Sequence, residues 1–158
     1  MISNTARPKA VFIMWLQLQL QDKLLTKDRL LKWESKVEPQ CMLCQNEDET
    51  RDHLFVKCAY TRRLWVGLAT WMQMSYDIGG NWQHHLAWVL KNAKEKTIRA
   101  QIFKIVYAEA VYALWIERNQ RVFEQRTNGV DRIIRTIAFI CNVRASSKTS
   151  PLVQSWLV

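Results

Sequence analysis

Apolar residues recur along the chain at gaps of three and four positions, which is the spacing of one face of an α-helix. This pattern predicts helices over residues 9–21, 27–35, 60–74, 82–90, 98–126 and 132–144, followed by a short apolar tail over 151–158. No stretch shows the alternation that is typical of a strand. Four glycines and three prolines in 158 residues leave little material for hairpins and tight turns. We therefore predict an all-α, multi-helix domain.

The stretch over residues 98–126 is the longest of these segments, and its middle is apolar almost all round. A helix of that kind is buried on several sides, so we predict a long central helix with Thr97 as its N-cap. Thr26 is the expected N-cap of the helix over 27–35. Gly79-Gly80 marks residues 76–81 as the clearest linker.

Three of the four cysteines lie in the pattern Cys41-x2-Cys44-x8-His53-x4-Cys58. Two cysteines separated by two residues can face one ion across a tight turn, and a histidine and a further cysteine can complete a tetrahedron. This ligand set is typical of a closed structural Zn²⁺ site, which has no position left for a catalytic water. We predict one structural zinc ion on these four residues. The alternatives are a redox Cys-x2-Cys pair, whose usual strand–helix context is missing here, and ordinary buried thiols.

The spacing of the last two ligands constrains the backbone. His53 and Cys58 are five residues apart, and a straight α-helix turns by about 100° per residue, so the two side chains would not share a face. We expect His53 in the first turn of a helix that starts near Arg51, capped by Thr50 with Asp52, and Cys58 at an end or an irregularity. The polar segment 45–52 is expected to be an exposed loop.

The other cysteine and the other histidines have simpler interpretations. Cys141 lies in an apolar run and is expected to be a small buried hydrophobe. His84 and His85 are adjacent on a predicted helix, so they point about 100° apart and are poorly placed to share an ion. We expect both at the surface or at an interface. Most of the eight tryptophans are expected to be buried anchors.

The formal net charge of +9 is unevenly distributed. Residues 1–90 carry eleven Lys/Arg against nine Asp/Glu, a charge of +2, whereas residues 91–158 carry twelve against five, a charge of +7. A basic half is compatible with binding to nucleic acid, to anionic lipid or to an acidic protein. It is equally compatible with a solvated helix surface that has no partner. The segment from Glu38 to Cys58, here called the zinc loop, is locally acidic and therefore binds phosphate poorly. Phosphate contacts are therefore expected from basic residues outside it: Arg62, Arg63, Lys91, Lys94, Lys96, Arg118, Arg121, Arg126, Arg132 and Arg135.

Localisation is only weakly constrained. The longest apolar tract is interrupted by charges and falls short of a membrane span, so no membrane partner is expected. Clustered cysteines of metal-binding type suggest a reducing compartment, the nucleus or the cytoplasm. Arg7 and Lys9, with no acidic residue before Asp22, are also compatible with an organelle transit peptide, although a core helix is the favoured interpretation.

Several motifs, taken together, resemble a known family. They are Pro8-Lys9-Ala-Val-Phe-Ile-Met-Trp15, Leu25-Thr26-Lys-Asp28-Arg29-Leu30, Cys41-x2-Cys44, Glu49-Thr50-Arg-Asp-His53-Leu54-Phe55, Cys58 and Arg63-x-Trp65. The combination resembles the zinc-binding domain that follows the reverse transcriptase in plant non-LTR retrotransposon proteins. The run Trp115-x-Glu117-Arg118-Asn119-x-Arg121-x-Phe123 resembles the helix after that domain, so the resemblance covers about residues 8–125. The family's zinc ligands correspond to Cys41, Cys44, His53 and Cys58.

The resemblance implies a non-catalytic zinc-binding module of retroelement origin that helps to hold RNA or DNA. The sequence shows no paired aspartates of a polymerase and no carboxylate cluster for two-metal cleavage, so we expect no enzymatic activity. The alternatives are a zinc-stabilised scaffold that docks on a protein through apolar helices, and an inactive transposon-derived remnant. We expect a zinc-binding helical domain over 8–75, a basic helical region packed on it over 82–145, and a short tail over 146–158.

Overall fold

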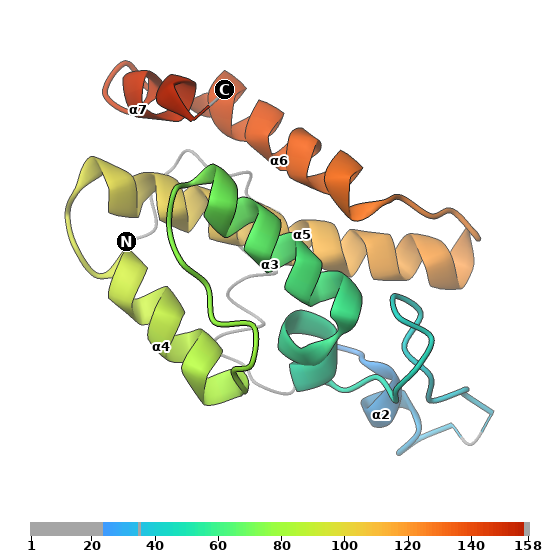
Figure 1. The fold of residues 1–158 in the computed structure, drawn as a ribbon. Coiled ribbons are helices and arrows are strands. Elements are labelled where there is room, and N and C mark those ends of the chain that lie inside the picture. The colour runs from blue at the N-terminus through green and yellow to red at the C-terminus, as the bar shows by residue number, and fades with distance from the viewer. Residues whose placement is uncertain (1–23, 35, 157–158) are drawn as a thin grey trace.

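The computed structural model describes residues 24–34 and 36–156, which form helices joined by short connections, except for a long irregular segment between the first two elements (Figure 1). The elements are α2 (Lys27–Leu30), the π-helical turn η1 (His53–Lys57), α3 (Ala59–Trp71), α4 (Trp82–Ala93), α5 (Ile98–Phe123), α6 (Val130–Arg144) and α7 (Ser150–Ser155). No strand occurs in this part of the chain, where Gln40 and Asp48 form an isolated antiparallel bridge. The predicted all-α fold is confirmed. The helix predicted over 9–21 lies outside the described residues.

Helix α5 is the predicted long central helix. It packs against α3, α4, α6 and η1 (Figure 1). Its middle residues Ala108, Ala110, Val111 and Leu114 have no exposed surface. The Thr97 hydroxyl accepts a hydrogen bond from the Ala100 N–H at 3.1 Å, so the predicted N-cap is confirmed. Neither α5 nor any other helix of the described residues is long and apolar enough to cross a membrane.

One core contains residues from both halves of the chain, including Leu54 and Phe55 of η1 and Ile102 and Phe103 of α5. Cys141 is buried in this core, as predicted. Trp65, Trp82 and Trp156 are buried, and Trp71, Trp88 and Trp115 pack partly against the same core. Trp33 differs from these, because 68% of its surface is exposed.

The helix predicted over 27–35 is shorter in the structure and ends at Leu30. Thr26 occupies the N-cap position, but its hydroxyl donates to the Asp28 carboxylate at 2.6 Å and accepts no hydrogen bond from the helix. The Lys27 N–H donates instead to the Glu49 carboxylate at 2.9 Å. The predicted N-cap position is confirmed, but the Thr26 side chain caps no N–H of α2, because the Lys27 and Asp28 N–H groups donate to the carboxylate and the carbonyl of Glu49.

His85 is buried inside the protein, which corrects the prediction that it lies at the surface or at an interface. Its Nδ1 lies 3.1 Å from the Tyr76 hydroxyl and its Nε2 lies 3.0 Å from the Tyr107 hydroxyl, while the ring contacts Trp65. These partners come from the linker, α3 and α5, so the pattern of α4 alone does not reveal them. Burial lowers the pKa of His85 to about 4. His84 is exposed and caps α4 together with Asn81.

Replacing His85 with glutamine is expected to weaken the pH dependence of stability. Histidine titrates near pH 6.5 in the unfolded chain and at about 4 in the folded protein. Between these values the unfolded state binds more protons, so stability is present above pH 6.5 and is lost as the pH falls towards 4. The shift corresponds to about 3 kcal/mol. Urea unfolding at several pH values measures the slope, and His84→Gln is the matched control. Identical slopes for His85→Gln and the wild type would contradict this assignment.

Candidate metal centre

The first two predicted ligands, Cys41 and Cys44, lie on a tight turn. The Gln45 N–H donates to the Cys41 carbonyl and the Cys41 N–H donates to the Glu47 carbonyl, both at 2.8 Å. Gln45 has a φ of 57°, in the left-handed region, which reverses the chain immediately after Cys44. The turn therefore presents both thiols to one side.

The other two predicted ligands begin and follow the π-helical turn. The Cys58 N–H donates to the His53 carbonyl at 2.7 Å, and this five-residue hydrogen bond defines a π-helix. The wider turn brings positions five apart onto one side, so the predicted irregularity is confirmed. The Thr50 hydroxyl accepts from the His53 N–H at 3.0 Å, whereas the Asp52 carboxylate pairs with Arg51 and caps nothing.

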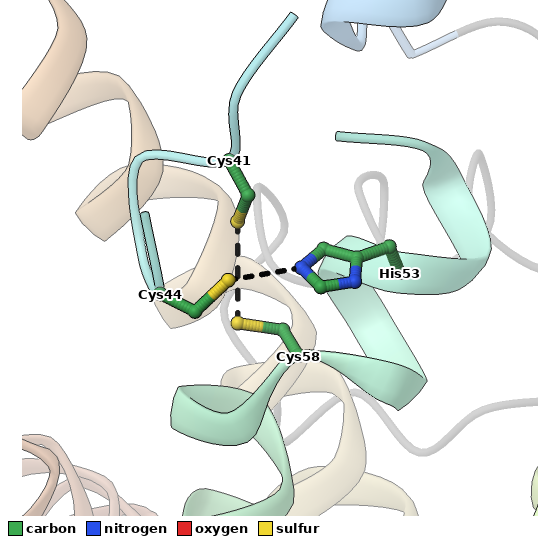
Figure 2. A group of neighbouring side chains, drawn as sticks. All are labelled: Cys41, Cys44, His53 and Cys58. Carbon is green, nitrogen blue, oxygen red and sulfur yellow. Dashed lines mark hydrogen bonds between the residues drawn. The ribbon is translucent and has the colours of Figure 1, made fainter. Parts of the chain in front are cut away.

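The four side chains converge, and their ligand atoms all lie within 4.8 Å of one another (Figure 2). The Sγ atoms of Cys41 and Cys58 are 4.0 Å apart, and Cys44 Sγ lies 3.2 Å from His53 Nε2. A tetrahedral Zn²⁺ ion with Zn–S bonds of about 2.3 Å separates its sulfur ligands by about 3.8 Å. The donor set and its dimensions therefore fit a tetrahedral zinc site. Cys41, His53 and Cys58 are buried, as in closed sites.

The close packing of these groups changes their proton affinities. The hydrogen bond with Cys58, followed by burial, raises the pKa of the Cys41 thiol to about 12, and the same contact lowers the pKa of Cys58. The hydrogen bond with Cys41 raises the pKa of His53 to about 9. Cys41 and His53 therefore hold their protons more tightly than usual, whereas Cys58 releases its proton more readily. A divalent cation among them would displace those protons and favour three thiolates.

A carboxylate lies behind the histidine of the cluster. Glu47 Oε2 is 3.4 Å from His53 Nδ1, although the buried Nδ1 makes no hydrogen bond. Glu47 thus lies near the place of the carboxylate that orients a histidine ligand in metal sites by accepting a hydrogen bond from its second ring nitrogen. The sequence analysis did not single out Glu47, and its only signal was the acidic run Glu47-Asp48-Glu49.

Arg118 has a different role from the predicted phosphate contact. Its side chain is 3% exposed and forms an ion pair with Glu49, with Nη2 donating to Oε1 at 2.7 Å and Nε donating to both carboxylate oxygens at 3.1 Å. Glu49 has no exposed surface, which also corrects the prediction that the whole 45–52 loop is exposed. Because this guanidinium is buried and already paired, we no longer expect it to contact a phosphate.

Arg121 holds the cysteine turn in a similar way. Its Nη1 donates to the carbonyls of Met42 and Leu43 at 3.2 and 3.1 Å, and its Nε donates to the Glu117 carboxylate at 2.8 Å. Only 13% of the Arg121 side chain is exposed. The guanidinium therefore links α5 to the residues between Cys41 and Cys44, and we no longer expect it to bind phosphate.

The other predicted basic residues are more accessible. Arg63, Arg132 and Arg135 are exposed, as are Lys91 in the last turn of α4 and Lys94 and Lys96 of the α4–α5 connection. Arg126 is 72% exposed and lies 3.5 Å from Glu124. Arg62 is half-buried, and its Nε has no partner among the described residues.

The fold and the cluster together define an all-helical protein with a Cys₃His site suited to zinc. Residues 1–65 match a family model described as zinc-binding in reverse transcriptase, which confirms the predicted resemblance over that part of the chain. The match includes all four cluster residues and ends within α3. No curated protein and no solved structure matches the chain.

Proposed function

We propose that this chain is a non-catalytic, zinc-stabilised module of retroelement origin, of the plant non-LTR class, that binds RNA or DNA. One structural zinc ion, held by Cys41, Cys44, His53 and Cys58, orders the segment between α2 and α3. The match of residues 1–65 to the reverse-transcriptase family and the geometry of the Cys₃His cluster support the zinc part of this proposal. The run that begins at Trp115 resembles the helix after that domain in plant non-LTR retrotransposon proteins, and it supports the proposed retroelement origin.

The distribution of exposed arginines carries the nucleic-acid part of the proposal. Arg63 on α3 and Arg132 and Arg135 on α6 are exposed and have no ion pair among the described residues. A polyanion is the partner that such cations favour. The zinc loop carries five acidic residues between Glu38 and Cys58. The loop therefore positions the helices, and the arginines of the helices contact the phosphates.

Binding to nucleic acid is expected to weaken steeply with salt. Three or four phosphate contacts on a single strand give a slope of log K against log salt between about −2 and −3. Affinity then falls about 20- to 50-fold between about 50 and about 200 mM salt. Fluorescence anisotropy with labelled RNA and DNA of equal length, with and without a chelator, measures this slope.

Two other outcomes separate the competing functions. A protein that binds no nucleic acid at low salt but purifies with a stoichiometric protein partner is a scaffold, and the proposal is then wrong. A folded, zinc-containing protein that binds neither is an inactive remnant, and the proposal fails in the same way.

A further inference from the structure

Helix α6 carries an unusual outer face. It lies along one edge of the molecule, with α3 and α5 on its inner side (Figure 1). Arg132, Arg135, Phe139 and Val143 follow one another at gaps of three and four residues, so they form one line on the helix. All four are exposed, and Phe139 and Val143 are 67% and 65% exposed. We call these four residues the α6 stripe.

A hollow of about 330 Å³ lies beside the stripe, between α5 and α6. Arg132 belongs to both features, since it lines the hollow and begins the stripe. The remaining lining mixes isoleucines such as Ile116 and Ile140 with polar groups such as Gln120 and Thr136. Apolar walls with a few polar groups suit a ligand that has apolar faces and hydrogen-bonding edges, such as a heterocyclic base.

The charges near the stripe favour an anionic partner. The single carboxylate of α6, Asp131, lies with Arg63 in the separate groove between α3 and α6. Glu117 borders the hollow, but its carboxylate already accepts hydrogen bonds from Arg121 and from the N–H and side chain of Asn128. Arg132 and Arg135 are exposed and form no ion pair among the described residues, although Asp131 lies four residues before Arg135 on the same helix.

We infer that the α6 stripe and the adjoining hollow bind single-stranded nucleic acid. Arg132 and Arg135 contact successive phosphates, Phe139 stacks on an unpaired base, and the hollow receives a neighbouring base. Stacking on one aromatic ring needs the open face of a base, which a duplex hides. This inference rests on the proposed function and specifies both the surface and the form of nucleic acid.

The test uses the full chain with its zinc and fluorescein-labelled 12-nucleotide probes: single-stranded RNA, single-stranded DNA and the DNA duplex. Arg132→Gln/Arg135→Gln is expected to weaken single-strand binding at least about tenfold and to make the salt slope shallower by about 1.4. Phe139→Ala is expected to weaken it at least about fivefold. The RNA and DNA arms show which single strand is preferred.

Matched controls come from exposed residues of the same kinds elsewhere. Lys148→Gln and Phe123→Ala change exposed side chains that lie outside α6 and outside the expected phosphate contacts, and both are expected to keep wild-type affinity. If Arg63→Gln or Arg126→Gln weakens binding while the α6 variants do not, the α6 inference is wrong and the proposed function stands. Equal affinity for the duplex also overturns the inference. If the wild type binds none of the probes, the proposed function itself fails.

Discussion

Replacing Cys41 with alanine is expected to abolish stoichiometric zinc binding and to lower the free energy of unfolding by several kcal/mol. Structural zinc in small peptide domains supplies on the order of 10 kcal/mol of apparent binding energy, which becomes folding energy because the unfolded chain has no preformed site. The segment from Gln40 to Cys58 has an isolated bridge and one π-helical turn as its regular structure. Such a segment needs a cross-link to stay ordered.

Two measurements check this expectation. Elemental analysis of the purified wild type should give about one zinc per chain, and urea unfolding followed by circular dichroism should shift to lower urea in the variant and in chelator-treated protein. Cys141→Ala is the matched control, because it removes a buried thiol far from the cluster in sequence and should leave the zinc content unchanged. Chelated protein that unfolds at the wild-type urea concentration would show that zinc has no structural role.

The residues that form the candidate metal site were predictable from sequence because the information is local. The spacing of Cys41, Cys44, His53 and Cys58 fixes which side chains can meet, and the five-residue step to Cys58 already required the irregularity that η1 supplies. The presence of the helices and the N-cap at Thr97 were predictable for the same reason, since both depend on residues that are close in sequence.

The roles of individual polar residues were not predictable, because they depend on distant partners. Arg118 and Glu49 are 69 residues apart in sequence, so charge counting placed one on a phosphate-binding surface and the other in an exposed loop. His85 became a core residue only because hydroxyls from Tyr76 and Tyr107 meet both ring nitrogens. One signal was present: Glu117 and Arg118 follow directly on the apolar middle of α5, where a charged side chain needs a buried partner.

Replacing Glu49 with alanine is expected to lower the free energy of unfolding by about 3–5 kcal/mol, because removing one partner of a buried ion pair leaves the other charge uncompensated. Glu49 and Arg118 are 0% and 3% exposed, so water cannot take the place of the lost carboxylate. The Lys27 N–H at the start of α2 also loses its acceptor. Because Glu49 lies between two pairs of ligands in sequence, the variant should also bind zinc more weakly.

The exposed pair of Arg126 and Glu124 provides the matched control. Its atoms are 3.5 Å apart and its side chains are 72% and 52% exposed, so Glu124→Ala should change stability by less than about 1 kcal/mol. Urea unfolding at fixed zinc concentration compares the two variants. Glu49→Leu/Arg118→Met, which removes both charges and fills the space, should be more stable than Glu49→Ala, since no charge remains unpaired. If Glu49→Ala costs no more than Glu124→Ala, the buried pair does not hold α5 to the zinc loop, and the motif after Trp115 must serve another purpose.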